Sequence, residues 1–162
     1  MASSQFEHTR LGLACPKVVV LAPLVWINPL GTFAEMTVRV LIVDDQPAFR
    51  TAAREVIASS EGFVVVGEAL TGEESIASAR HLHPDLVLMD VVLPGVDGLE
   101  AARRIRAENR DVVVFLLSTY EMENFATRIG ASGANAFIPK AAFDPSSLVQ
   151  AWRQATTKTS PG

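Results

Sequence analysis

The sequence has a single cysteine, no excess of basic residues and no unbroken apolar run long enough to cross a membrane. Because Cys15 is alone, no intramolecular disulfide can form, and nothing indicates an oxidising compartment. The net charge of −4 argues against a nucleic-acid surface, which needs a basic patch. The apolar run at residues 18–27 is far shorter than the roughly 20 residues of a membrane span. These features predict a cytoplasmic protein that binds neither nucleic acid nor a membrane.

The first 35 residues lack the features of a secretory signal, which has a basic start, an unbroken apolar middle and a small-residue cleavage site. Acidic Glu7 stands near the start, and Pro23 and Pro29 interrupt the apolar part. A buried strand pattern begins directly after Met36. We therefore expect Met36 to be the natural start and residues 1–35 to be a disordered or mis-assigned extension. The alternative is a functional anchor or an extra strand.

Strand and helix patterns alternate five times after this extension. Short apolar, β-branched runs predict buried parallel strands, and apolar residues three and four positions apart predict amphipathic helices. The expected strands are 38–43, 63–66, 86–89, 112–117 and 136–138. The expected helices are one from Pro47, one after the capping-box pair Thr71 and Glu74, 99–108, 121–129 and one from Pro145.

This alternation predicts an α/β fold with a doubly wound, five-stranded parallel sheet and helices on both faces, because strand-helix-strand crossovers are right-handed. We expect one domain at residues 36–157 and a frayed C-terminal tail at residues 158–162. In sheets of this type, ligands bind at the carboxyl ends of the strands. The residues at those ends therefore decide the chemistry.

Polar residues follow four of the five expected strands. Asp44 and Asp45 come after the first, Asp90 after the third, Ser118 after the fourth and Lys140 after the fifth. Three carboxylates at one edge would repel one another, and a hard cation such as Mg²⁺ relieves that repulsion. A lysine and a hydroxyl suit a transferring phosphoryl group, and a carboxylate can be its nucleophile. These residue types point to an acyl phosphate formed on an aspartate.

Four motifs make the chain similar to a bacterial response-regulator receiver domain over residues 37–156. Each motif alone is common, so the resemblance rests on their order and on their placement at strand ends. They are Val40-Leu41-Ile42-Val43-Asp44-Asp45, Leu88-Met89-Asp90 with Leu93-Pro94-Gly95-Val96-Asp97-Gly98, Leu117-Ser118-Thr119 and Phe137-Ile138-Pro139-Lys140. The resemblance implies a flavodoxin-like fold, as in chemotaxis regulators, and a phosphorylation-dependent switch of a two-component phosphorelay.

The resemblance also implies a metal site and a phosphate acceptor. Asp90 would accept a phosphoryl group from a phosphohistidine on a sensor histidine kinase or phosphotransfer protein. Asp45 would bind Mg²⁺ directly, with help from Asp44 and Asp90. The backbone carbonyl of Val92 would be a further ligand. Such a domain is not an enzyme acting on a separate substrate, although it can catalyse its own phosphorylation and dephosphorylation.

A switch would follow from the same resemblance. Lys140 would contact the acceptor and then its phosphate, Ser118 would move to hydrogen-bond that phosphate, and the rotamer of Phe137 would report the movement. The surface of the last two strands would then contact a downstream protein or a second copy of the chain. Val92 and Tyr120 occupy positions that tune phosphate lifetime in the family, and apolar Val92 predicts slow decay.

Simpler interpretations of these residues remain open. Asp44 and Asp45 could cap the helix that follows them, and Phe137 could be an ordinary core residue. Thr119 stands where a small alanine is frequent in the family, which would narrow access to the phosphate.

The expected output is also open. The pattern is closest to receivers of LuxR-type regulators, yet only residues 141–162 follow Lys140, too few for a recognition helix. We favour a stand-alone receiver over a fragment of a transcriptional regulator. Two alternatives come from other classes: an aspartate-nucleophile phosphatase, and a receiver-like interaction module that works without phosphorylation. Adjacent Asp44 and Asp45 differ from the Asp-x-Asp pattern of such phosphatases.

Overall fold

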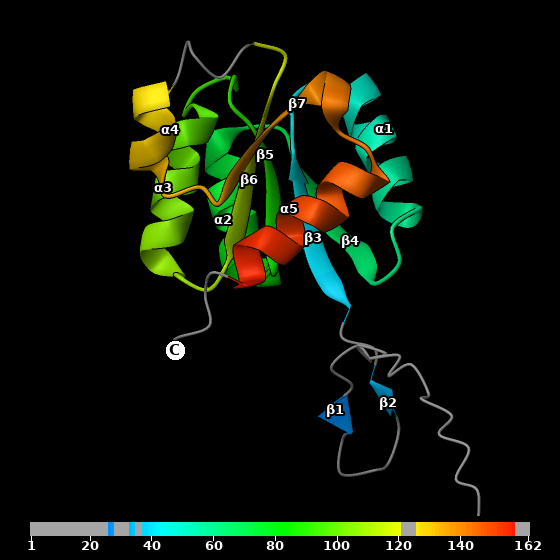
Figure 1. Ribbon diagram of the computed structural model, residues 1–162. Coiled ribbons are helices and arrows are strands. Elements are labelled where there is room, and N and C mark those ends of the chain that lie inside the picture. The colour runs from blue at the N-terminus through cyan, green and yellow to red at the C-terminus, as the bar shows by residue number, and fades with distance from the viewer. Residues whose placement is uncertain (1–25, 28–32, 35–36, 121–125, 158–162) are drawn as a thin grey trace, which may run out of the picture. The chain divides into compact units, whose positions relative to one another are not determined.

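Five parallel strands form the central sheet, in the order β4-β3-β5-β6-β7 (Figure 1). This computed structural model describes residues 26–27, 33–34, 37–120 and 126–157. The strands of this sheet are β3 Val38–Val43, β4 Phe63–Ala69, β5 Leu86–Asp90, β6 Val113–Ser118 and β7 Ala136–Pro139. The central strands β5 and β6 are buried along their whole length, as expected of parallel strands covered on both faces.

Helices cover both faces of the sheet. They are α1 Pro47–Ala58, α2 Gly72–Leu82, α3 Gly98–Glu108, α4 Ala126–Ser132 and α5 Pro145–Thr157, with a short 3-10 turn, η2, at Lys140–Ala142. One apolar layer packs α2, α3 and α4 against the sheet through residues such as Ile76 and Ile105. The other packs α1 and α5 through Ile57 and Leu148. The predicted doubly wound α/β fold is therefore confirmed.

Two described element boundaries differ from the prediction by more than one residue. Strand β4 continues past Val66 to Ala69, because pairing with β3 through a register shift after Val40 holds the polar end in the sheet. Helix α4 ends at Ser132 instead of Ile129, and Gly130 lies inside it. Gly130 costs about 1 kcal/mol in an exposed helix, which is too little to end it. Residues 121–125 of the predicted helix lie outside the described residues.

Helix capping follows the sequence closely. The hydroxyl of Thr71 accepts from the Glu74 amide at 3.1 Å, as the capping box predicts. The Glu74 carboxylate accepts from the amide of Leu70 at 2.7 Å, one residue before the cap. The N-cap of α1 is Gln46, so the interpretation of Asp44 or Asp45 as its cap is wrong.

The first 34 residues form a separate unit. In it the structure describes two antiparallel strands of two residues, β1 Trp26–Ile27 and β2 Phe33–Ala34, which form a sheet of their own. The boundaries proposed for the extension, the domain and the tail stay predictions, and residues 158–162 lie outside the described part. Among the helices that are described, none has the length and apolar character to cross a membrane.

Candidate metal centre

The carboxyl ends of three neighbouring strands bring the predicted site residues together. Asp44 directly follows β3, Asp90 ends β5 and Ser118 ends β6. In the sheet register, Asp90 lies beside Leu117, and Ser118 lies beside Pro139, which precedes Lys140. Asp44, Asp90 and Ser118 are buried although they are polar, so their surroundings must satisfy them.

Lys140 lies between two of the buried carboxylates. Its Nζ is 2.8 Å from Oδ2 of Asp90, to which it donates a hydrogen bond, and 2.6 Å from Oδ2 of Asp44. The ammonium group also lies 4.6 Å from the centre of the Phe49 ring, within cation–π range. The Lys140 side chain is only 6% exposed, so these contacts take the place of water.

Three carboxylates lie close enough together to hold a metal ion. One oxygen from each of Asp44, Asp45 and Asp90 lies within 4.8 Å of the others. Oδ2 of Asp44 is buried and, despite its ion pair with Lys140, has no hydrogen-bond donor with suitable geometry in the described part of the chain. Asp45 is exposed, which leaves an open side for water. An all-oxygen donor set with room for water suits Mg²⁺.

The carboxylate of Asp90 is held at both oxygens. Oδ1 accepts from the amide of Val92 at 3.1 Å, and Oδ2 accepts from Lys140. Burial raises the pKa of Asp90 above its ordinary value, although the hydrogen bonds from Lys140 and Val92 oppose that shift. Burial alone would lower the pKa of Lys140, but Asp44 and Asp90 outweigh it and raise that pKa. The charged lysine therefore compensates the two carboxylates.

The loop after Asp90 is held close to the acceptor. A Cβ added to Gly98 would lie 1.8 Å from the Asp90 carbonyl oxygen, so only glycine allows this approach. The amide of Gly98 donates to the carbonyl of Val91 at 3.1 Å. Val92 lies in this loop, between Asp90 and Gly98 in the sequence, and the residue is 50% exposed.

The two predicted switch residues lie at different depths. Ser118 is fully buried, and its hydroxyl accepts from the amide of Tyr120 at 3.0 Å. Phe137 is partly buried and packs against the apolar layer beneath α2, α3 and α4. Both the core interpretation of Phe137 and a switch role fit this position.

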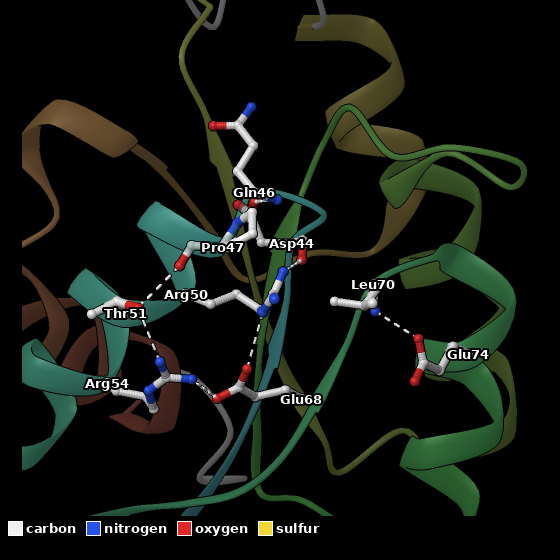
Figure 2. A network of polar contacts seen from close by, with 9 residues as sticks. All are labelled: Asp44, Gln46, Pro47, Arg50, Thr51, Arg54, Glu68, Leu70 and Glu74. Atoms are coloured by element: carbon white, nitrogen blue, oxygen red, sulfur yellow. Dashed lines mark hydrogen bonds and ion pairs between the residues drawn. The ribbon is translucent and has the colours of Figure 1, made fainter.

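Two residues near the site were not singled out from the sequence. The ring of Phe49 packs against Phe143 with centroids 6.1 Å apart, and it also contacts the ammonium of Lys140. Arg50 donates to the backbone carbonyl of Asp44 at 2.9 Å, as Figure 2 shows. The one available signal was their place in the first turn of the helix after the acidic pair.

Comparison with known families assigns the chain. Residues 40–153 match the response regulator receiver domain family, which is well over half of the sequence. The chain belongs to this family. It is a receiver domain of the response regulators used in two-component systems, and such domains interact with histidine kinases and downstream effectors. The phosphatase alternative is therefore wrong.

The chain resembles receivers of several LuxR-type regulators. It is 43% identical over 105 residues to the response regulator GacA of Pseudomonas viridiflava, covering 65% of this chain and 49% of GacA. It is 36% identical over 118 residues to the nitrate/nitrite response regulator NarL of Escherichia coli, covering 72% of this chain and 53% of NarL. The chain thus spans about half the length of these curated relatives.

Solved structures show the same fold. A LuxR-family two-component response regulator from Aurantimonas sp. SI85-9A1 superposes with a TM-score of 0.68 at 34% identity, over 75% of this chain and 86% of that one. The signal receiver domain of the putative response regulator NarL from Mycobacterium tuberculosis gives a TM-score of 0.68 at 28% identity, over 75% and 97%.

Proposed function

We propose that Asp90 accepts a phosphoryl group from a phosphohistidine on a sensor histidine kinase or phosphotransfer protein. The observation that carries the proposal is the contact of Lys140 with both Asp90 and Asp44 at the edge of a three-carboxylate cluster. A carboxylate oxygen of Asp90 would attack the phosphorus. The new P–O bond forms as the P–N bond breaks, and the electron pair of that bond returns to the imidazole.

The cluster residues would hold Mg²⁺, which neutralises charge on the phosphoryl oxygens when it is bound. Asp44, Asp45 and Asp90 supply carboxylates, and the backbone carbonyl of Val92 is the further ligand that we propose. Oδ2 of Asp44 supports this assignment, because it is buried and its partner among the described residues is the Lys140 ammonium, an ion pair without hydrogen-bond geometry. Asp45, as the exposed member, would bind the cation from the solvent side.

The chain's own groups would then stabilise the acyl phosphate. Lys140 is positioned to pass from the Asp90 carboxylate to a phosphate oxygen, because its ammonium already lies against that carboxylate. Ser118 would exchange its contact with Tyr120 for one with the phosphate, and Phe137 would change rotamer with it. This local change would alter the surface near β6 and β7 for a downstream protein or for a second copy of the chain.

The proposed setting is the cytoplasm, where the kinase or phosphotransfer protein presents its phosphohistidine. The output of the longer relatives is not carried over to this chain, and no direct contact with nucleic acid or a membrane is proposed. The domain would act as a switch and not on a separate substrate.

Intact mass spectrometry after incubation with Mg²⁺ and acetyl phosphate tests the proposal. We expect the mass of one phosphoryl group to be added, only with Mg²⁺, to the wild type and to Asp111→Asn. Asp111 is an exposed aspartate at the opposite edge of the sheet, just before β6, so it is a matched control. Asp90→Asn should gain nothing. No gain by the folded wild type with acetyl phosphate or phosphoramidate would instead favour the phosphorylation-independent module.

A further inference from the structure

The side chain of Arg50 links the metal-binding loop to strand β4. One terminal nitrogen of its guanidinium donates to the carbonyl oxygen of Asp44 at 2.9 Å, and Nε donates to the Glu68 carboxylate at 3.0 Å. The Arg50 side chain is 15% exposed, so both contacts are largely shielded from water. Figure 2 shows Arg50 reaching across from α1 between these two partners.

We propose that Arg50 is a positioning residue that fixes the direction of the Asp45 carboxylate for cation binding, by tying the Asp44 carbonyl to Glu68. This inference rests on the proposed Mg²⁺ site. It assigns a role to a residue that need not touch the cation, the phosphate or Asp90.

Asp45 depends on its backbone for its position. The Asp44 carboxylate is buried and is held by the amide of Gln46 and by Lys140, whereas Asp45 is exposed. A side chain that is solvated keeps its rotamer freedom, and binding a cation then costs the entropy of ordering it. A fixed backbone reduces that cost by limiting the directions in which the carboxylate can point.

Both peptide groups that flank Asp45 are held. Arg50 holds the carbonyl of the peptide that joins Asp44 to Asp45, and because that peptide is planar, the N–H of Asp45 is held with it. The amide of Gln46, which belongs to the next peptide, donates to Oδ1 of Asp44 at 2.8 Å. With the peptide on each side fixed, the Cα–Cβ bond of Asp45 has a fixed direction.

The network also balances its charge. A lone guanidinium beside three carboxylates would compete electrostatically with a bound cation. Glu68 offsets that charge, and its other oxygen accepts from Arg54. Arg54 also donates to the hydroxyl of Thr51 at 2.9 Å. In the described part of the chain it forms no hydrogen bond or ion pair with Asp44 or Asp45, and its only ion pair there is with Glu68. The planar fork of arginine suits two partners at once, whereas a lysine ammonium is a single point charge.

A role through charge and a role in positioning predict opposite changes in Mg²⁺ affinity when the Arg50 side chain is replaced. If the guanidinium acted only through its charge, Arg50→Met would bind Mg²⁺ more tightly, because a nearby cation is lost. If Arg50 positions Asp45, the same variant binds Mg²⁺ more weakly, by about tenfold as for other residues that support metal ligands. Arg54→Met removes an equal charge from the same network without touching Asp44, and is the matched control.

Two-dimensional amide NMR of the full chain, titrated with Mg²⁺ alone, reports both the surroundings of the Asp45 amide and the Kd for Mg²⁺. We expect Arg50→Met to move the Asp45 amide resonance before any Mg²⁺ is added, and to raise the Kd for Mg²⁺. Arg54→Met should leave that resonance and the Kd within about twofold of the wild type. An unchanged or lower Kd for Arg50→Met would overturn the positioning role.

Failure of the inference and failure of the proposed function are distinguishable. A wild type that shows no Mg²⁺-dependent shifts at Asp44, Asp45 and Asp90 refutes the proposed metal site itself. A wild type that binds Mg²⁺ as tightly as Arg50→Met refutes only the role of Arg50. Should Arg50→Met give the narrow amide dispersion of an unfolded chain, Arg50→Lys replaces it. We expect a raised Kd there too, and a wild-type Kd would overturn the inference.

Discussion

The ammonium of Lys140 lies 2.8 Å from the carboxylate of Asp90, and both side chains are nearly closed to solvent. The same ammonium reaches Asp44, so one cation compensates two buried carboxylates. Removing one partner of such a buried arrangement leaves uncompensated charge in the interior. The stability of the domain and the reactivity of the acceptor should therefore both depend on this lysine.

We expect Lys140→Met to lower the free energy of unfolding without Mg²⁺ by about 3 kcal/mol, the usual cost of breaking a buried ion pair. Added Mg²⁺ should restore more stability to the variant than to the wild type, because it replaces the missing cation. Urea unfolding with and without Mg²⁺ measures both effects. Arg153→Met, which removes an exposed cation from α5, is the control. Equal stabilisation of the variant and the wild type by Mg²⁺ would contradict the role of Lys140 as the cation that compensates Asp44 and Asp90.

The rate of phosphorylation should respond to the same substitution. Losing one group that stabilises developing charge commonly slows a reaction on the order of a hundredfold. We expect that loss for Lys140→Met with acetyl phosphate at saturating Mg²⁺, followed by intact mass over time. A variant that is phosphorylated at the wild-type rate would show that Lys140 serves stability alone.

Gly98 should be indispensable because its α-carbon lies against the acceptor's own backbone. An alanine Cβ would lie 1.8 Å from the carbonyl oxygen and 2.8 Å from the carbonyl carbon of Asp90. The loop must move, and we expect Gly98→Ala to cost about 2 kcal/mol or more in urea unfolding. Gly130→Ala is the matched control, since nothing lies within 4 Å of its added Cβ. It should stabilise α4 by about 0.5–1 kcal/mol. Similar effects of both changes would refute the steric argument.

The site residues that the sequence predicted share one geometric cause. Parallel strands end at the same edge of a sheet, so polar residues at the carboxyl ends of β3, β5 and β7 must meet there. The positions of Asp44, Asp90 and Lys140 follow from that rule once the strands are recognised. Their roles in binding Mg²⁺ and phosphate stay predictions.

The features that the sequence did not predict depend on contacts between distant segments. To predict the contact of Arg50 with Asp44, one would have to know how α1 is rotated about its own axis. One would also have to know that Arg50 pairs with Glu68, eighteen positions later in the chain. Strand β4 runs to Ala69 because β3 pairs with it, although its own residues include Gly67 and the polar Glu68. Helical periodicity can place Phe49 on the inner face of α1, but it cannot show that the ammonium of Lys140 lies over the Phe49 ring.

Asp97 should make stability depend on acid pH. It caps α3 by accepting from the Glu100 amide at 2.9 Å, and it pairs with Arg128 of α4. Burial would raise the pKa of Asp97, but the Glu100 amide and Arg128 outweigh it and lower that pKa below 3.8. A lowered pKa means that the ionised group stabilises the fold above about pH 3.8. That stability is lost as the pH falls through the folded-state pKa.

Two substitutions at Asp97 separate its cap from its charge. Asp97→Ala should cost about 1 kcal/mol at pH 7, because the cap is lost. Asp97→Asn keeps a capping oxygen and loses the pair with Arg128, so it should cost less and should flatten the fall in stability below pH 4. Urea unfolding between pH 3 and pH 7 measures this. If the free energy of unfolding of Asp97→Asn falls below pH 4 as steeply as that of the wild type, another group causes the pH dependence.

Val92 should set the lifetime of the proposed acyl phosphate. Its side chain is half exposed, and its amide donates to Oδ1 of Asp90, so it stands next to the acceptor with no polar group to orient water. Val92→Asn would place an amide there, and we expect the phosphate to be lost several-fold faster, short of the roughly hundredfold effect of a positioned general base.

Leu70→Asn changes another exposed apolar residue, in the loop after β4, and should leave the decay unchanged. Intact mass at intervals after removal of acetyl phosphate gives both rates. Slower decay in Val92→Asn than in the wild type would contradict the role of the apolar side chain, because a polar group at that position would then be shielding the phosphate from water.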